Sequence, residues 1–577
     1  LTTYFEGSSI EIVYVQGLQF GVMTVEIDGA VVQVVNTAGP NNSIQQLSID
    51  DLVPGSHILR VYSVQGVIGI DAFRADFESS TVTARTTSPS QNRHQQAANC
   101  DGSNTIADGD VSSLITAIET ANANAGTDTI CLAAGGTYTL TTNYSSENGF
   151  PDITDNLYIQ GQDATIARDS GAPVFRFFEV KNTAAFFSWS DITLIGGAAN
   201  AAGGAIRNDG GGIFINDSTL SNNTANTGGA IDNQSGSGTV TADGTTFADN
   251  TASYGGAIDN DIDNDLYVYN SVFTNNQAAY DGGAIHNDDG DLTVTGSQFT
   301  GNLAGRYGGA IDSDAISTAV IQNSTFDNNG AASRGGAINN EGQLTISNNT
   351  IITNNAVASG GWGGAIHTDD YLWFEDSTIS GNSAHRGGGI YNRGEDLQIV
   401  DSILSGNSAV DGGGALFTRD GVSVISGSQF TANSSDTEGG AIFAYSNHTL
   451  TITNTVIDTN TADGLGGGIY SKSIVGITDS AFVDNVSLIN GGAFYNSSTG
   501  VPTVNDTCIV GNSDTAVYAS SGTQDFTANW WGDASGPSED GPGTGDSVNS
   551  HIDFANFALD DSICTGLGNP LDGASLV

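Results

Sequence analysis

The sequence predicts an all-β protein, a right-handed parallel β-helix of about twelve or more coils, preceded by a small β-sandwich domain. The first observation is that Gly-Gly-Ala-Ile, or a close variant, recurs about every 26 residues from Gly203 onward. The second is an apolar residue followed three positions later by Asn, found between successive copies. The third is a short alternating run before that pair, such as Leu292-Thr-Val294. Each unit therefore contains three short strands and three turns.

The fourth residue of the glycine motif marks the start of each unit. It occupies twelve positions: Ile206, Ile231, Ile258, Ile285, Ile311, Ile338, Ile366, Ile390, Leu416, Ile442, Ile469 and Phe494. One unit cannot bury its own apolar face, so the units must stack at the roughly 4.8 Å spacing of paired strands. The right hand follows from the general handedness of crossovers between parallel strands.

Two asparagine positions recur with the same period. Asn tolerates left-handed turns, and stacked amides can bond to each other along the coils, so both columns are predicted to be structural ladders. The first ladder is Asn223, Asn250, Asn276, Asn302, Asn329 and Asn382, with Asn355, Asn407, Asn433, Asn460, Asn485 and Asn512 at the equivalent positions of other coils. The second, two places after the motif, is Asn208, Asn233, Asn260, Asn287, Asn340, Asn392 and Asn496.

Composition limits the function. The chain has 577 residues, 14 basic and 64 acidic, with a net charge of −50. It contains only two lysines, Lys181 and Lys472, so it cannot neutralise a phosphate backbone, and nucleic-acid binding is excluded. No apolar stretch is long enough to predict a transmembrane segment. The start at Leu1, without Met, is read as a processed mature product.

The four cysteines lie at the two ends of the repeat region. Cys100 and Cys131 are close in sequence, as are Cys508 and Cys564, so two local disulfides are the natural pairing among three possible connectivities. Disulfides indicate an oxidising, extracellular location, whereas the alternative is four buried thiols. No Cys/His cluster with zinc spacing is present in the sequence.

The repeats carry a resemblance to a known family. The combination of Gly-Gly-Ala-(Ile/Leu/Val) with an apolar residue, two spacers and Asn resembles the repeats of the polymorphic outer-membrane protein family of bacterial adhesins, over about 190–515. The resemblance implies a β-helix at the cell surface that takes part in adhesion. Residues 100–189 are then the N-terminal cap and first coils, and 516–577 the C-terminal cap and tail.

A helix is predicted over 110–123. Asp110 is a good N-cap, and Val111, Leu114, Ile115 and Ile118 fall on one face. The segment from Val111 to Ile130 is similar to the N-terminal cap of CSLREA-type surface proteins, although Ser112, Ile115 and Thr116 depart from that pattern. Such a helix would close the exposed edge of the first coil.

The closing segment contains two tryptophans. Asn529-Trp-Trp-Gly and the following Gly-Pro resemble the last coil of many β-helix proteins. Trp530 and Trp531 are expected to plug that coil, and the alternative is that they hold a sugar.

Residues 1–77 lack the repeat and predict strands at 10–15, 22–28, 31–35, 58–64 and 67–73, followed by a polar linker over 78–99. The later strands resemble the jelly-roll accessory modules of carbohydrate-active and surface proteins. Such modules have strands ahead of Phe5 for which this chain has little room. An incomplete sandwich would leave an edge for a strand from another subunit, with Leu571–Val577 as the candidate donor, or would simply be a compact sheet.

The residue after each motif points outward and gives the candidate sites. Asp232, Asp259, His286 and Asp312 stack there, and like charges one coil apart would raise one pKa, but a solvated face is predicted. Five successive coils then carry Tyr391, Phe417, Phe443, Tyr470 and Tyr495, predicted to be an exposed interaction stripe for another subunit or a glycan, or else covered by a loop.

Acidic turns give a possible metal site. Ca²⁺ is possible at Asp259, Asp261, Asp263, Asp265, Asp288, Asp289 and Asp291, although no EF-hand spacing is present and hydrated turns are the simpler reading. No other cofactor is expected. We therefore predict an extracellular structural or adhesive protein without enzyme activity. It is expected to assemble with copies of itself into a filament, sheath or surface layer through the rod ends and the N-terminal domain. The alternatives are a polysaccharide-active β-helix enzyme, whose paired carboxylates and basic residues are not evident, and a glycan-binding module.

Overall fold

The computed structural model describes two compact units, Leu1–Ala97 and Ala98–Val577. In the first unit it describes the strands alone. In the second it describes residues 100, 105–181, 185–234, 236, 238–394, 396–446, 448–497 and 502–564. The predicted linker over 78–99 and the predicted donor strand Leu571–Val577 lie outside the described residues.

The first unit contains two antiparallel sheets. One has the strand order β1-β6-β3-β4 and the other β5-β2-β7. Their bounds are β1 Thr2–Gly7, β2 Ile10–Gln16, β3 Val22–Ile27, β4 Ala30–Asn36, β5 Ser43–Ile49, β6 Gly55–Gln65 and β7 Gly69–Ala75. The five predicted strands are confirmed. The sequence analysis missed β1, which pairs with β6, and β5, which pairs with β2.

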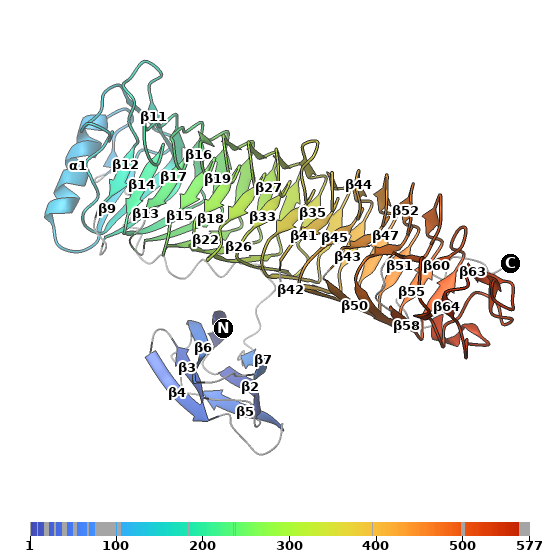
Figure 1. The fold of residues 1–577 in the computed structure, drawn as a ribbon. Helices are drawn as coiled ribbons and strands as arrows, with labels where there is room; N and C mark the ends of the chain where they lie inside the picture. Colours follow the sequence, from blue (N-terminus) through green and yellow to red (C-terminus); the bar gives the residue numbers. More distant parts are fainter. Residues whose placement is uncertain are drawn as a thin grey trace. The chain divides into compact units, whose positions relative to one another are not determined.

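The second unit is a parallel β-helix, and Figure 1 shows its coils as a rod with α1 (Val111–Ala123) at one end and β63 and β64 at the other. Three sheets run along it, with 31, 16 and 10 strands. A typical coil contributes two strands to the largest sheet, such as β26 (Asp291–Thr295) and β27 (Gln298–Thr300). It adds one strand to each of the others, β29 (Ile311–Ser313) and β28 (Leu303–Ala304) in this case.

In the repeats, each strand of the 16-stranded sheet starts at the fourth residue of the glycine motif. Its strands are β12 Phe178–Val180, β14 Ile206–Asp209, β17 Ile231–Gln234, β21 Ile258–Asn260, β25 Ile285–Asn287, β29, β33 Ile338–Asn340, β37 Ile366–Thr368, β41 Ile390–Asn392, β45 Leu416–Thr418, β49 Ile442–Ala444, β53 Ile469–Ser471, β57 Phe494–Asn496, β60 Val517–Ala519, β62 Pro537–Glu539 and β63 Gly545–Val548.

The largest sheet starts in the N-terminal coils. Its first strands are β8 Thr105–Ile106, β9 Asp128–Leu132, β10 Thr137–Leu140, β11 Leu157–Arg168 and β13 Phe186–Ile195, and it ends at β64 Ile552–Asp553. The 10-stranded sheet consists of two-residue strands from β20 (Thr251–Ala252) to β56 (Val486–Ser487). Adjacent coils pair in register throughout the repeats, for example Ile285 with Ile311. The motif residues therefore form one continuous buried core.

Both asparagine ladders are present. In the first, each amide donates from Nδ2 to Oδ1 of the next Asn, without a break from Asn223 to Asn512. The second runs directly from Asn208 through Asn233 and Asn260 to Asn287. Beyond Asn287 hydroxyl groups replace some of its amides.

The ends of the rod are closed as predicted. Asp110 caps α1 by accepting a hydrogen bond from the Ser113 amide at 3.0 Å, and Leu114 and Ile118 are fully buried on the first coils. The structure joins Cys100 to Cys131, and Cys508 to Cys564 near the last coil. Of the described helices, none has the length and apolar character that crossing a bilayer requires.

Trp531 is completely buried in the last coil, which supports the predicted plug. Trp530 is half-buried and packs beside the cluster that contains Cys508 and Cys564.

Candidate functional site

One column of outward-facing residues follows the middle of the 16-stranded sheet. Strand register places these residues directly above one another. In chain order they are Glu179, Arg207, Asp232, Asp259, His286, Asp312, Asn339, His367, Tyr391, Phe417, Phe443, Tyr470, Tyr495 and Tyr518. The column is charged in its first half and aromatic in its second.

The prediction that the acidic part is a solvated face is wrong. Asp232, Asp259 and Asp312 are at most 3% exposed and His286 is 8% exposed. The segment before each glycine pair folds back over the sheet. Tyr254, four residues before Ile258, places its ring 5.4 Å from that of His286.

The sequence does contain a pattern that marks the residues covering this column. The position four residues before the first strand residue carries large or polar side chains in successive coils, namely Thr227, Tyr254, Asp281, Tyr307, Arg334, Trp362 and Arg386. Several of these positions also pair from coil to coil, which gives the covering segments a regular stack of their own.

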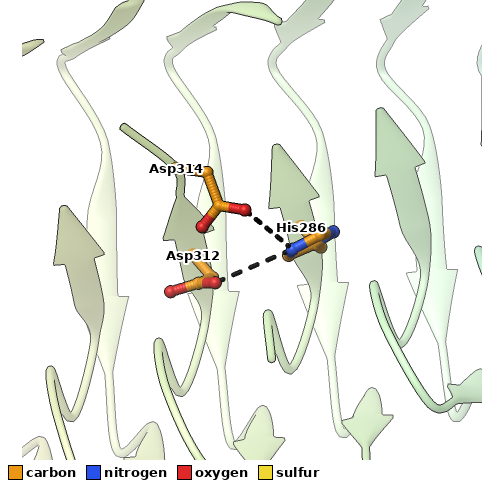
Figure 2. A group of neighbouring side chains, drawn as sticks. All are labelled: His286, Asp312 and Asp314. Atoms are coloured by element: carbon orange, nitrogen blue, oxygen red, sulfur yellow. Dashed lines mark ion pairs between the residues drawn. The ribbon is translucent and has the colours of Figure 1, made fainter. Parts of the chain in front are cut away.

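His286 is held between carboxylates from the neighbouring coils. Its Nδ1 lies 2.7 Å from Oδ1 of Asp259 on β21, which is a hydrogen bond. Its Nε2 faces the next coil, where Oδ2 of Asp312 is 3.8 Å away and Oδ2 of Asp314 is 3.7 Å away, as Figure 2 shows. Asp312 lies on β29 and Asp314 in the turn after it. Asn339 donates to Oδ1 of Asp312 at 2.8 Å, which fixes that carboxylate.

These residues line a cleft of about 380 Å³. Its walls are Thr227, Tyr254, Asp259, Asp261, Asp281, His286, Asp288, Arg306, Tyr307, Asp312, Asp314 and Glu341. Seven of these side chains carry carboxyl groups, against one guanidinium and one imidazole. Arg306 is already paired with Asp281 and lies 4.7 Å from the centre of the Tyr307 ring. The cleft is therefore a site with excess negative charge.

The cleft shifts the pKa values of its acids. Burial raises the pKa of Asp314 to about 6 and also raises that of Asp312, although the charge of His286 opposes both shifts. Burial by itself would lower the pKa of His286, but the hydrogen bond and charge of Asp259, together with Asp312 and Asp314, outweigh it, so that pKa is raised.

Asp232, two coils before His286, also has a raised pKa. Burial, and then the charge of Asp259, raise it to about 8, despite the hydrogen bond from Thr227 and the charge of Arg207. Its Oδ1 is buried, and within the described structure it has no hydrogen-bond partner. Burying an unpaired charge is costly, so the folded protein favours the protonated acid.

We expect Asp232→Asn to stabilise the protein at alkaline pH. The folded pKa lies above the unfolded value, so the folded state binds more protons between about pH 4 and 8, and stability falls as pH rises through that window. Asn removes this loss. Thermal unfolding should show a melting temperature a few degrees above wild type at pH 9 and little difference at pH 4. Equal melting temperatures at pH 9 would contradict the raised pKa.

The predicted interaction stripe is not exposed. Tyr391, Phe417, Phe443 and Tyr470 are at most 5% exposed, and Tyr495 is half-buried. Successive rings stack with centroids 4.7–5.4 Å apart, so they bury one another. Arg386 and Lys472 lie over the faces of the stack. The stack is part of the packing of the rod.

The structure also changes the predicted calcium site. Of the seven acids, Asp259, Asp261 and Asp288 line the cleft, whereas Asp263, Asp265, Asp289 and Asp291 do not. Among the described residues, the group whose ligand atoms all lie within 4.8 Å of one another is His286, Asp312 and Asp314. The calcium prediction contained none of these three. Sequence reasoning placed His286 and Asp312 in a column but missed Asp314, which comes from a turn.

Comparisons with known proteins agree with the repeat architecture. Residues 363–530 match the description "right handed beta helix region", and residues 270–288 and 323–341 match the Chlamydia polymorphic membrane protein repeat. The chain is a right-handed β-helix with repeats of the polymorphic membrane protein type. The matched repeats 270–288 and 323–341 each end in a Gly-Gly-Ala-Ile strand of the 16-stranded sheet, and the first of them contains His286.

No curated protein matches the chain. Among solved structures, it is similar to the catalytic unit of a GH87 alpha-1,3-glucanase from Streptomyces thermodiastaticus at 10% identity, covering 96% of this chain and 89% of that one, with a TM-score of 0.24. A GH87 alpha-1,3-glucanase catalytic domain in complex with nigerose is similar at 12% identity, covering 89% and 88% of the two chains, with a TM-score of 0.21.

Proposed function

We propose that this protein, a β-helix with repeats of the polymorphic membrane protein type, is an extracellular structural or adhesive protein of the cell surface. We propose that it associates with copies of itself. The observation that supports it best is the repeat itself, because the matched repeats are of a membrane-protein type and stack into one long rod. A solenoid presents the same surface many times, which suits attachment and assembly. The two disulfides fit an oxidising location outside the cytoplasm.

Self-association is assigned to the first unit. The N-terminal end of the rod is covered by α1, and Trp531 fills its last coil, so adding coils end to end is disfavoured. The two antiparallel sheets of the first unit end in strands β1, β4, β5 and β7, each paired on one side within its sheet. An edge strand can accept a strand from another copy.

Electron microscopy of the purified full chain tests this proposal. We expect filaments or sheets whose length grows with protein concentration, and protease treatment of intact cells should remove the protein. Rods that stay single at every concentration would overturn self-association. Protection from protease on intact cells, with digestion after lysis, would overturn the surface location.

A polysaccharide-active enzyme is the second candidate, and the cleft is the observation that favours it. Carboxylate oxygens of Asp312 and Asp314 lie within 4.8 Å of each other, and retaining glycosidases also use two neighbouring carboxyl groups, roughly 5–5.5 Å apart. Release of reducing ends from neutral and acidic polysaccharides that is lost in Asp312→Asn, but kept in Asp263→Asn, would establish this activity. No release from any of them by the wild-type protein would remove it.

A further inference from the structure

We propose that His286, Asp312 and Asp314 bind a divalent transition-metal ion, with Asp259 orienting the imidazole. This metal site is separate from the proposed surface function, and the metal could bind even if that function were wrong. It lies in the cleft on the outer face of the 16-stranded sheet, where Figure 2 shows the imidazole pointing toward both carboxylates.

The two nitrogens of the His286 imidazole make different contacts, a hydrogen bond at Nδ1 and longer contacts to two carboxylates at Nε2. Nδ1 makes a hydrogen bond of 2.7 Å to Asp259. Nε2 stands 3.8 and 3.7 Å from the oxygens of Asp312 and Asp314, too far for hydrogen bonds. Ligands at about 2.0–2.2 Å from a tetrahedral metal ion lie roughly 3.3–3.6 Å apart. The two distances from Nε2 exceed this ligand spacing by only a few tenths of an ångström, and the two carboxylate oxygens lie within 4.8 Å of each other. Small shifts of the two carboxylates would therefore bring all three atoms to a shared ion.

The surroundings of the three side chains direct one atom of each toward the same position in the cleft. His286 is only 8% exposed, and its Nε2 faces the carboxylates of Asp312 and Asp314 at ion-pair distance. Asp312 is 1% exposed, and Asn339 holds its Oδ1 so that Oδ2 is left to face the imidazole. The side chain of Asp314 is partly exposed, so an ion could reach the site from the solvent on that side. Strand register places His286 on β25 directly beside Asp312 on β29.

Asp259 supplies the usual outer partner of a metal-binding histidine. In protein metal sites the second imidazole nitrogen typically donates to a carboxylate, which fixes the tautomer and the ring orientation. The Nδ1 contact to Asp259 has this form and leaves Nε2 as the ligand. This arrangement distinguishes the site from an ordinary cluster of acidic turns.

The donor set selects the class of ion. One imidazole and two carboxylates suit Zn²⁺ or Mn²⁺, whereas Ca²⁺ prefers six to eight oxygen ligands. The cleft also contains Asp281 and Asp288, whose charge favours a cation over any anionic ligand. Arg306 does not compete for the site because it is paired with Asp281.

Isothermal titration of the EDTA-treated full chain with ZnCl₂, MnCl₂ and CaCl₂ tests the site. We expect one Zn²⁺ per chain and a Ca²⁺ affinity at least tenfold lower. Asp314→Asn should lower the Zn²⁺ affinity at least tenfold, and Asp259→Asn about 10- to 100-fold. Asp263→Asn is the matched control because Asp263 lies in an acidic turn outside the cleft, and its Zn²⁺ affinity should equal that of the wild type.

Electron paramagnetic resonance gives a second readout that does not depend on the carboxylate variants folding. Wild-type protein loaded with one equivalent of Cu²⁺ should show nitrogen hyperfine splitting that disappears in His286→Gln. Absence of that splitting in the wild type would overturn the proposal. So would a Zn²⁺ affinity that Asp314→Asn and Asp263→Asn leave equally unchanged.

Discussion

Gly309→Ala is expected to prevent the rod from folding, or to destabilise it by roughly 4 kcal/mol or more. Gly309 is the second glycine of its motif. A Cβ there would lie 2.0 Å from the carbonyl oxygen of Gly336 and 2.6 Å from the amide nitrogen of Gly330, both backbone atoms of the next coil. Neither atom can rotate away. The coils would have to separate, which would break the hydrogen bonds on both sides of the substitution.

The measurement is soluble yield followed by thermal unfolding monitored by circular dichroism. Gly476→Ala is the matched control, since Gly476 also lies in a strand of the rod, β54 (Ile474–Thr478), and a Cβ there meets nothing within 4 Å. We expect the control to unfold within a few degrees of the wild type. A Gly309→Ala protein with the same yield and melting temperature as the control would mean that the coils are less tightly stacked than described.

Asn329→Ala is expected to destabilise the rod by roughly 3–5 kcal/mol, because it leaves more than one buried polar group without a partner. Asn329 donates to the carbonyl oxygen of Phe299 and to Oδ1 of Asn355, each at 3.0 Å. Its own Oδ1 accepts from the backbone amide of Asn302 at 3.0 Å and from that residue's Nδ2 at 2.9 Å. One truncation therefore affects three coils.

Urea unfolding at neutral pH measures this loss, with Gln298→Ala as the control because Gln298 is an exposed residue of the same region. Asn329→Asp provides a sharper comparison. It keeps the acceptor for Asn302 but loses both donors, so it should also destabilise the rod. If Asn329→Ala unfolds at the same urea concentration as Gln298→Ala, the ladder does not contribute to stability.

The repeating parts of the fold were predictable because each structural demand recurs with the same spacing. The large apolar residue at the start of each repeat, usually isoleucine, Asn in the ladders and the paired glycines all occupy positions where strand register leaves little choice of residue. The helix over 110–123 was predictable from its cap and apolar face. In the first unit, β1 and β5 were missed.

The candidate site was harder to predict because alternation along a strand separates inward from outward but does not say what lies outside. His286 and Asp312 were correctly placed in one outward column, yet they were taken to face solvent. The covering segments precede the glycine pairs, and one that covers His286 comes from the coil before it, so burial depends on Tyr254 and its equivalents in other coils. Asp314 joins the cleft from a turn, where no periodic pattern marks it.

The unbroken first ladder has an electrical consequence. Every amide from Asn223 to Asn512 donates in the same direction along the rod, so their dipoles add, with the positive end at Asn512. There Nδ2 of Asn512 donates to the carboxylate of Asp546 at 2.8 Å, and the backbone amides of Gly511 and Asn512 donate to the same group. At the opposite end, the Gly197 amide donates to Asn223 at 2.9 Å. The positive end of the row of amides is therefore bound to the Asp546 carboxylate, just as an acidic side chain often caps the positive N-terminal end of an α-helix.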